Sequence, residues 1–182
     1  MKFIKTHIDG LYIIEPKLWE DDRGHFYESY NKQLFEEAGI IADFVQDNES
    51  LSNRGVVRGL HAQRAPFAQG KLMRVVQGKV MDIVVDIRKH SPTFGQYVRV
   101  ELSSENRRMF WVPPGFLHGF AALVDHTIFN YKVTSLYDKA SEVGVVWNDP
   151  DLNIDWGITD QVAHVSEKDK LLPRLKEIEA PF

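Results

Sequence analysis

Five short stretches rich in β-branched and aromatic residues follow one another through the middle of the chain. They span residues 71–76, 79–87, 96–102, 110–113 and 127–134. Residues of this kind favour strands, whereas the breaks between them, such as Gln77-Gly78, favour turns. Strands this short and this closely spaced predict an all-β barrel or sandwich.

Two helical features are predicted around these strands. Residues 32–38 can form a short helix, because Asn31 can cap its start and Gly39 can end it. The tail at 168–178 has helical periodicity interrupted by Pro173, which predicts one or two irregular turns covering the barrel.

The length and composition favour one domain. The 182-residue chain has no long linker, so we expect a single domain over residues 1–182, whose core its 43% hydrophobic residues can fill. No apolar run is long enough for a signal peptide or a membrane span. The absence of cysteine excludes disulfides and cysteine-ligated metals, and it fits a reducing compartment. We therefore expect a soluble, cytoplasmic protein.

The charge pattern favours a small anionic ligand. A formal net charge of −4 is unlike the broad basic face of a nucleic-acid-binding protein, so nucleic acid is not an expected partner. Cations gather locally instead, since Arg58 and Lys71 flank His61, and a second histidine, His118, follows Pro113-Pro114-Gly115. Together these residues predict an anion-binding pocket that contains a proton-transfer base.

The same histidines raise the question of a metal site. The turn that leads to His118 is half of the metal motif of cupin barrels, whose other half needs His-x-His and a carboxylate. This chain offers only His61-Ala62-Gln63 there, and the cation Lys71 would repel a metal ion. We therefore expect no metal and no other cofactor. His61 and His118 can also be hydrogen-bonded core residues, and this alternative stays open.

Two acidic residues interrupt an otherwise apolar strand. Asp82 and Asp86 lie within residues 80–87, where buried carboxylates need partners. Arg88 and Arg99 are the predicted partners.

Several residues can carry out chemistry on a carbon acid next to a ketone. Such a reaction needs a base of near-neutral pKa, a cation for the enolate oxygen and an acid that returns the proton. His61 is the candidate base, with Asp169 behind its second ring nitrogen. Lys71 can stabilise the enolate oxygen, and Tyr131 can return a proton on the opposite face, which inverts a stereocentre. Each also has a simpler interpretation: Tyr131 as a wall residue, Asp169 as a solvated carboxylate and Lys71 as a surface cation.

Further residues can bind an anion. Arg23, Arg58 and Lys168 can neutralise a diphosphate, and an arginine suits bidentate contacts to phosphate. The polar segment 46–50 offers donors and acceptors that can read the edge of a base or sugar, although Asp47-Asn48 can also form a turn.

The chain also matches a known family in ordered motifs over almost its whole length. They are Asp22-Arg23-Gly24, Phe44-Val45-Gln46-Asp47-Asn48, Arg58-Gly59-Leu60-His61, Gln69-Gly70-Lys71-Leu72, Val85-Asp86-Ile87-Arg88, Pro114-Gly115-Phe116-Leu117-His118-Gly119-Phe120, Tyr131-Lys132, Trp147-Asn148-Asp149-Pro150 and Ser166-Glu167-Lys168-Asp169. With these motifs the chain resembles the dTDP-4-dehydrorhamnose 3,5-epimerases, metal-free cupin-type enzymes of deoxysugar biosynthesis.

The resemblance implies a cupin-type jelly roll with a few short peripheral helices, in a homodimer that exchanges N-terminal strands. It implies cofactor-free epimerisation of dTDP-4-dehydro-6-deoxy-D-glucose to dTDP-4-dehydro-L-rhamnose through enolates. By position, His61 would be the base, Asp169 its dyad partner, Tyr131 the acid and Lys71 the enolate stabiliser. The residues that would bind the dTDP-sugar are Arg23, Phe26, Glu28, Gln46, Asp47, Asn48, Arg58, Lys71, His118, Tyr137, Glu142 and Lys168, with Phe26 and Tyr137 flanking the thymine.

The chain departs from the family pattern at Ala62, where an aromatic residue is usual. This departure leaves open whether C3 and C5 are both inverted. The alternatives are a single-site 3- or 5-epimerase, a 3,4-ketoisomerase, a non-catalytic cupin that binds a nucleotide sugar, and a metal-dependent oxygenase.

Overall fold

Two facing β-sheets make up the body of the protein, in a computed structural model that describes residues 1–182. The strand order of the first sheet is β1 (Lys2–Lys5), β2 (Tyr12–Glu15), β10 (Met109–Val112), β7 (Lys71–Gln77), β12 (Thr127–Val133) and β5 (Gln46–Ser52). The order of the second is β13 (Glu142–Gly144), β6 (Val56–Gln63), β11 (Phe116–Ala122), β8 (Lys79–Asp86) and β9 (Tyr97–Ser103), and β14 (His164–Val165) pairs parallel to β6. Apart from this last pair, neighbouring strands are antiparallel. This arrangement is the expected jelly roll.

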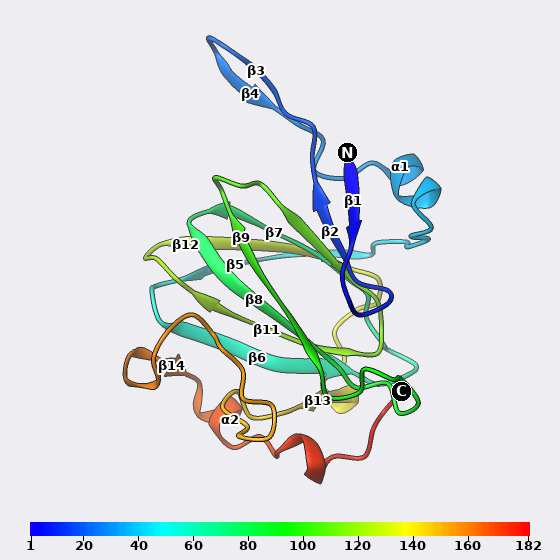
Figure 1. Cartoon of the computed structure of the whole chain (residues 1–182), viewed down its shortest axis with the longest axis vertical. Helices are drawn as coiled ribbons and strands as arrows, with labels where there is room; N and C mark the ends of the chain where they lie inside the picture. Colours follow the sequence, from blue (N-terminus) through cyan, green and yellow to red (C-terminus); the bar gives the residue numbers. More distant parts are fainter.

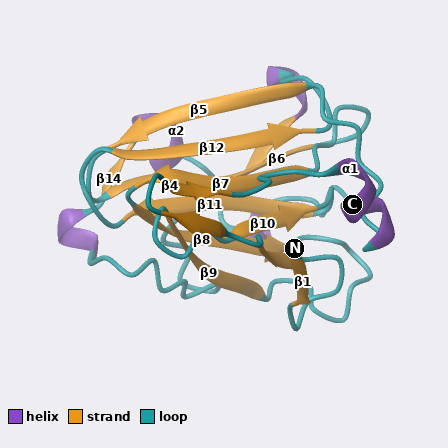
Figure 2. Cartoon of the chain, turned by 90° about the horizontal axis from the view of Figure 1, so that it is seen from above, coloured by secondary structure: helices purple, strands orange, loops and turns teal.

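Short elements lie around the sheets (Figure 2). They are α1 (Lys32–Glu37), α2 (Glu167–Lys170) and the 3-10 turns η1 (Lys139–Ser141), η2 (Asp160–Val162) and η3 (Leu175–Glu177). As predicted, Asn31 caps α1, by accepting a hydrogen bond from the backbone of Leu34. The C-terminal tail contains the expected short turns, α2 and η3. None of the helices has the length and apolar character needed to cross a membrane.

A hairpin projects from this body. It consists of β3 (Trp19–Asp21) and β4 (Gly24–Phe26), which pair only with each other. In Figure 1 the hairpin extends beyond the end of the sheets, next to the N-terminus. Trp19 and Phe26 expose 46% and 66% of their surfaces, although large aromatic side chains are ordinarily covered.

The core explains why β8 has an almost continuous apolar sequence. Its inward residues Val80 and Val84 pack in the cluster between the sheets, together with Phe110 and Phe129. Its outward residues, including Ile83, pack in a second cluster that the C-terminal segment covers with side chains such as Trp147 and Trp156. Because both faces of the strand are buried, both sets of alternating side chains are apolar.

All five predicted strand segments are confirmed, but two other expectations differ. Residues 46–52 form strand β5, so the turn that Asp47-Asn48 can make is not formed. The five predicted segments also leave out strands β1 to β6, which precede residue 71, and strand β11, whose glycine and alanine residues dilute the β-branched signal.

Of the two arginines predicted to pair with the buried aspartates, one does so and the other does not. Arg88 pairs with Asp86 at 2.7 Å, as expected. Asp82 instead contacts His118, and Arg99 pairs with Asp155. Asp82 points to the inner face of β8, where β11 is the neighbouring strand and presents His118.

Candidate active site

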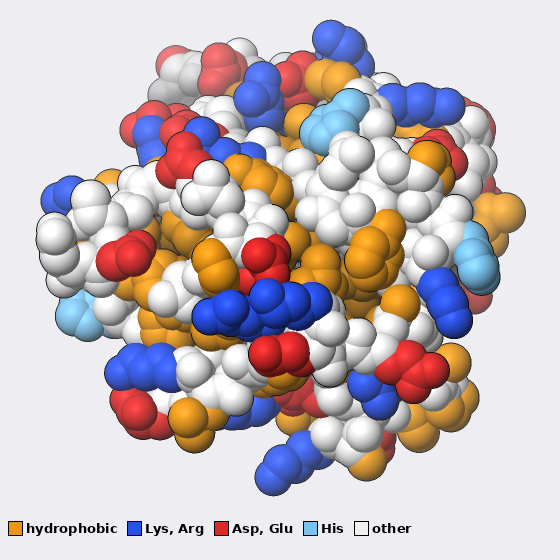
Figure 3. Space-filling model, turned by 60° about the horizontal axis from the view of Figure 1, so that its bottom comes forward, with side chains coloured by type: hydrophobic (Ala, Val, Ile, Leu, Met, Phe, Trp, Pro, Cys, Tyr) orange, Lys and Arg blue, Asp and Glu red, His pale blue; other side chains and the backbone are white.

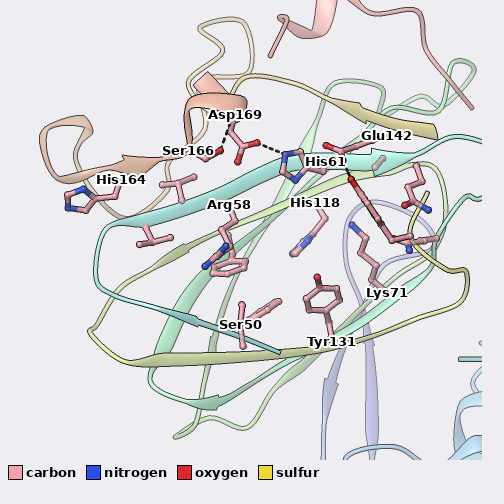
Figure 4. Close-up of a pocket in the computed structure, with 18 residues that line it drawn as sticks. Ser50, Arg58, His61, Lys71, His118, Tyr131, Glu142, His164, Ser166 and Asp169 are labelled. Atoms are coloured by element: carbon pink, nitrogen blue, oxygen red, sulfur yellow. Dashed lines mark hydrogen bonds and ion pairs between the residues drawn. The ribbon is translucent and has the colours of Figure 1, made fainter. Parts of the chain in front are cut away.

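A cavity of about 400 Å³ opens between the two sheets. Side chains from β5, β7 and β12 line one wall, and side chains from β6, β11 and β13 line the other, with α2 at the rim. Eight of the predicted site residues line it: Arg58, His61, Lys71, His118, Tyr131, Tyr137, Glu142 and Asp169. Figure 4 shows His61 and Tyr131 on opposite sides of this space, with Lys71 and His118 between them.

His61 and Asp169 form the expected pair. The Nε2 atom of His61 lies 2.7 Å from Oδ1 of Asp169, although the two residues are 108 positions apart in the chain. Ser166 caps α2 by accepting a hydrogen bond from the backbone of Asp169, which fixes the start of the helix that carries this carboxylate. Burial acts to raise the pKa of Asp169, but its contacts with His61 and Gly59 outweigh that effect and lower it. An ionised Asp169 holds the second ring nitrogen of His61 towards the cavity.

Tyr131 points into the cavity because successive side chains of β12 alternate between the two faces of the sheet. Thr127, Phe129 and Val133 share its face and are fully buried, whereas Asn130 and Lys132 lie on the other face. Burial raises the pKa of Tyr131, although the nearby charge of Arg58 acts in the opposite direction. The hydroxyl group therefore keeps its proton at neutral pH and can act as an acid.

Lys71 begins β7 at the inner end of the cavity. Burial lowers the pKa of its ammonium group to about 8, with Asp82 and Glu142 opposing the shift. Lys71 has no ion-pair partner within 4 Å. Its charge is therefore available for an anion in the cavity.

His118 forms a second histidine–aspartate pair. Its Nε2 atom lies 2.9 Å from Oδ2 of Asp82, and its ring stacks on Phe129 at 6.1 Å between centroids. Burial lowers the pKa of His118 and raises the pKa of Asp82, in each case against the attraction of the partner. The register of β11 and β6 places His118 directly opposite His61.

The rim of the cavity carries a polar cluster of three predicted residues. The hydroxyl group of Tyr137 donates to Oε2 of Glu142 at 2.8 Å, and Lys168 forms an ion pair with Oε1 of the same carboxylate. Burial acts to raise the pKa of Glu142, but Lys168 and Tyr137 lower it. On the face that carries α2 and β13, basic and acidic side chains lie against one another near the centre, between hydrophobic side chains (Figure 3).

The remaining predicted residues lie outside this cavity. Arg23 and Phe26 line a separate hollow on the projecting hairpin, and Arg23 pairs there with Asp21. Glu28 accepts a hydrogen bond from Asn31, near the start of α1. Gln46, Asp47 and Asn48 lie at the start of the edge strand β5, where Gln46 bonds to Asn48 and Asp47 pairs with Lys132.

Some lining residues were not singled out from the sequence. They include Gln63, Gln69, Phe129 and Ser166, whereas Ser50 belongs to the predicted polar segment 46–50. Gln63 carried a readable signal, because it lies two residues after His61 on a strand and therefore shares its face. Nowhere do three or more His, Asp or Glu side chains converge in a way that could hold a metal ion.

Comparisons with known proteins agree over nearly the whole chain. The sequence model of the family described as dTDP-4-dehydrorhamnose 3,5-epimerase matches residues 5–177. An enzyme of that name from Methanothermobacter thermautotrophicus is 51% identical over 178 residues, which cover 97% of this chain and 95% of that one. The crystal structure of the Elizabethkingia anophelis enzyme superposes with a TM-score of 0.94, at 48% identity and 97% coverage of both chains. A 3,5-epimerase from Legionella pneumophila, in complex with dTDP-4-keto-L-rhamnose, superposes with a TM-score of 0.93 at 49% identity, covering 98% of this chain and 95% of that one.

Proposed function

The chain belongs to the dTDP-4-dehydrorhamnose 3,5-epimerase family, and from this premise we propose that His61, Lys71 and Tyr131 carry out its reaction. The protein is an isomerase of dTDP-L-rhamnose biosynthesis. It converts dTDP-4-dehydro-6-deoxy-D-glucose to dTDP-4-dehydro-L-rhamnose by epimerisation at C3 and C5. The observation that carries the residue assignment is the placement of His61 and Tyr131 on opposite sides of one cavity.

Each inversion consists of two proton transfers. The free ring nitrogen of His61 takes the proton from the carbon next to the 4-keto group, while Asp169 stabilises the imidazolium that forms. The electrons of the broken C–H bond form the C=C bond of an enolate, and the negative charge moves to the oxygen at C4. Lys71 neutralises this oxygen. Tyr131 then returns a proton to the opposite face of the carbon, which inverts it.

The substrate-binding residues divide into two groups. Arg58, His118, Tyr137, Glu142 and Lys168 surround the cavity or its rim, where they can hold the sugar and the diphosphate. Arg23, Phe26 and Glu28 lie on or beside the projecting hairpin, and Gln46, Asp47 and Asn48 lie on the edge strand β5. We assign the second group to the nucleotide, and Tyr137 of the first group joins it there, because Tyr137 and Phe26 flank the thymine in this proposal.

The hairpin group reaches a cavity only if the hairpin docks on a second copy of the chain. We propose a homodimer in which the hairpin β3–β4 of each subunit completes the nucleotide site of the other. The exposed rings of Trp19 and Phe26 support this proposal, because they are uncovered within one chain. We further propose that residues 1–182 act as one domain, and that the cysteine-free enzyme works in the cytoplasm.

Solvent exchange tests the assignment of the base. In D2O, purified protein with the 4-keto substrate should incorporate deuterium at C3 and at C5, whereas His61→Asn should lose both exchanges by about 10²- to 10⁴-fold. His90→Asn is the control, since His90 is exposed in the loop after β8. Exchange at one carbon only in the wild type would indicate a single-site epimerase. Full exchange in His61→Asn would refute the role of the base.

A further inference from the structure

Gln63 makes an unusually complete set of hydrogen bonds at the cavity wall. The side chain is only 4% exposed. Its Nε2 atom donates to the carbonyl oxygens of Phe67 and Leu136 at 2.6 and 3.1 Å, and its Oε1 atom accepts from the backbone N–H of Asp138 at 2.9 Å. Both N–H groups of the amide and its oxygen are therefore engaged with backbone. Gln63 thus connects the loop that contains Phe67 with the loop that contains Leu136 and Asp138.

One of these loops carries Tyr137. Gln63 bonds to the residues on both sides of Tyr137, and thus holds the backbone that presents the tyrosine ring. Leu136 and Tyr137 expose 59% and 58% of their surfaces, so burial of apolar side chains contributes little to the conformation of this loop. Its conformation depends instead on polar contacts, among which those of Gln63 come from a side chain that is itself buried.

Gln63 does not need to touch a ligand to matter for binding. Its polar atoms are already occupied by backbone groups, so it has little capacity left for a substrate. A loop that is held in the binding conformation binds more tightly than one that must first be ordered.

We propose that Gln63 is a positioning residue for nucleotide recognition: it fixes the 136–138 loop so that the ring of Tyr137 is preorganised against the nucleoside diphosphate. This inference rests on the proposed function, which places Tyr137 beside the thymine. It assigns Gln63 to affinity and not to proton transfer, although Gln63 lies only two residues from His61 on β6.

Binding of dTDP to four proteins tests the proposal: wild type, Gln63→Met, Tyr137→Ala and the double variant. Methionine has a similar volume but cannot hold the three backbone groups. If the loop then occupies the binding conformation about a tenth of the time, the Kd for dTDP measured by calorimetry rises about tenfold. The kcat at saturating substrate should stay within about twofold of wild type, since loss of a preorganised binding contact raises KM and leaves kcat unchanged. The double variant should bind no more weakly than Tyr137→Ala alone, because the two changes act through one ring.

Gln77→Met is the matched control. Gln77 also donates to a loop carbonyl, that of His126 at 3.1 Å, but it lies at the far end of β7 from Lys71. It should leave Kd and kcat unchanged. Hydrogen exchange gives a second readout, in which the amide of Asp138 loses protection in Gln63→Met while the β6–β11 amides keep theirs.

Each contrary outcome is informative. If Tyr137→Ala binds dTDP as the wild type does, both the placement of Tyr137 and the role of Gln63 are wrong. If Tyr137→Ala binds weakly and Gln63→Met binds normally, only the role of Gln63 is wrong. Additive losses in the double variant, or equal losses of kcat and affinity in Gln63→Met, would show that Gln63 does not act through Tyr137. Should Gln63→Met fail to fold, Gln63→Asn keeps a neutral amide that is too short to reach the loop, and the same comparisons apply to it.

Discussion

At the scale of single residues, the two proposed proton carriers of the cavity are held by different means. The hydrogen bond to Asp169 orients His61, whereas the alternation of β12 and the packing of Phe129 direct Tyr131. The proposed base therefore depends on a tertiary contact, and the proposed acid depends on the strand that carries it. The two positions should respond differently to substitution.

Replacement of Asp169 by Asn tests whether His61 depends on its contact with Asp169. The amide cannot stabilise the imidazolium form of His61, so kcat should fall by about 10²- to 10⁴-fold while the affinity for dTDP stays near that of the wild type. Turnover measurements and calorimetry check this prediction. Asp125→Asn is the control, because Asp125 also accepts a backbone hydrogen bond, from Arg54, but lies away from the cavity. An unimpaired Asp169→Asn enzyme would refute the dyad.

Replacement of Tyr131 by Phe separates the two proton transfers. Without the hydroxyl group, His61 can still remove and return a proton on one face of the carbon. We therefore expect deuterium exchange from D2O without inversion, and loss of the epimerised product. Product analysis by NMR distinguishes the two processes. Normal inversion in Tyr131→Phe would assign the acid to another residue.

Lys71 should set an alkaline limit to turnover. Since burial lowers its pKa to about 8, the ammonium group loses its proton above that pH and no longer neutralises the enolate oxygen. We expect kcat/KM, which reports the ionisation of groups in the free enzyme, to decline above about pH 8. Asp82 acts to raise the pKa of Lys71, so Asp82→Asn should move the decline to lower pH. A pH profile of kcat/KM for both proteins is the measurement, and a flat profile up to pH 10 would exclude this role of Lys71.

At the scale of elements, the close antiparallel pairing of β6 and β11 determines where the two histidines meet. A Cβ atom on Gly59 would lie 2.6 Å from the carbonyl oxygen of His118 and 2.6 Å from Cα of Gly119, and Gly59 has a φ of +113°. The register between the strands shifts just beyond His118. Only glycine allows this close approach, and the approach places His61 opposite His118.

Replacement of Gly59 by Ala tests this close approach of the two strands. The left-handed backbone of a non-glycine residue costs about 1–2 kcal/mol, and the contact with β11 adds about 1–3 kcal/mol. Gly39→Ala is a matched control, because Gly39 has a φ of +83° but a Cβ atom there would meet nothing within 4 Å. Urea unfolding should show a clearly larger loss of stability for Gly59→Ala. Equal losses for the two variants would mean that the strands can separate at little cost.

The end of β8 contributes a pH-dependent part of the stability. Burial acts to raise the pKa of Asp86, but hydrogen bonds from Arg88, Ser91 and Thr93 lower it to about 2, below its ordinary value of 3.8. Because the folded-state pKa is depressed, this stabilisation is complete above about pH 4 and is lost as the pH falls towards 2; it amounts to about 2 kcal/mol. Unfolding free energies measured between pH 2 and 7 should show this decline in the wild type. Asp86→Asn should lack that part of it, and an identical pH dependence in both proteins would contradict the prediction.

At the scale of the whole molecule, the projecting hairpin is the feature that a single chain does not explain. If each hairpin completes the cavity of the other subunit, every site consists of the two sheets of one subunit and the hairpin of its partner. A substitution in the sheets and a substitution in the hairpin of the same subunit then damage two different sites of the dimer. His61→Asn and Arg23→Ala homodimers should then each have low activity. After unfolding and refolding together, random pairing should restore about a quarter of the wild-type activity, since half of the dimers contain one intact site of two. The absence of any recovery, with sedimentation confirming mixed dimers, would show that the hairpin serves its own subunit.

The sequence predicted strands β7 to β10 and β12 of the barrel, and it pointed to His61, Lys71 and Tyr131, which line one cavity. The strands of the middle region, helix α1 and its cap at Asn31 are local patterns, and the chemistry of His61, Lys71 and Tyr131 follows from their side chains. Strand β5 was harder to predict, because its polar residues 46–50 carry no apolar alternation. The partner of Asp82 was wrong for a related reason: the prediction favoured arginines near in sequence, whereas the neighbouring strand supplied His118.

By itself, the sequence determined which segments form strands and which side chains can move protons, since both are properties of residues and their near neighbours. Only the tertiary structure decided which residues meet: Asp169 with His61 across 108 positions, Asp82 with His118, and Gln63 with the loop of Tyr137. The physical reason is that strand pairing and sheet packing bring distant segments together, and register, crossing and loop closure fix the contacts that sequence spacing does not contain.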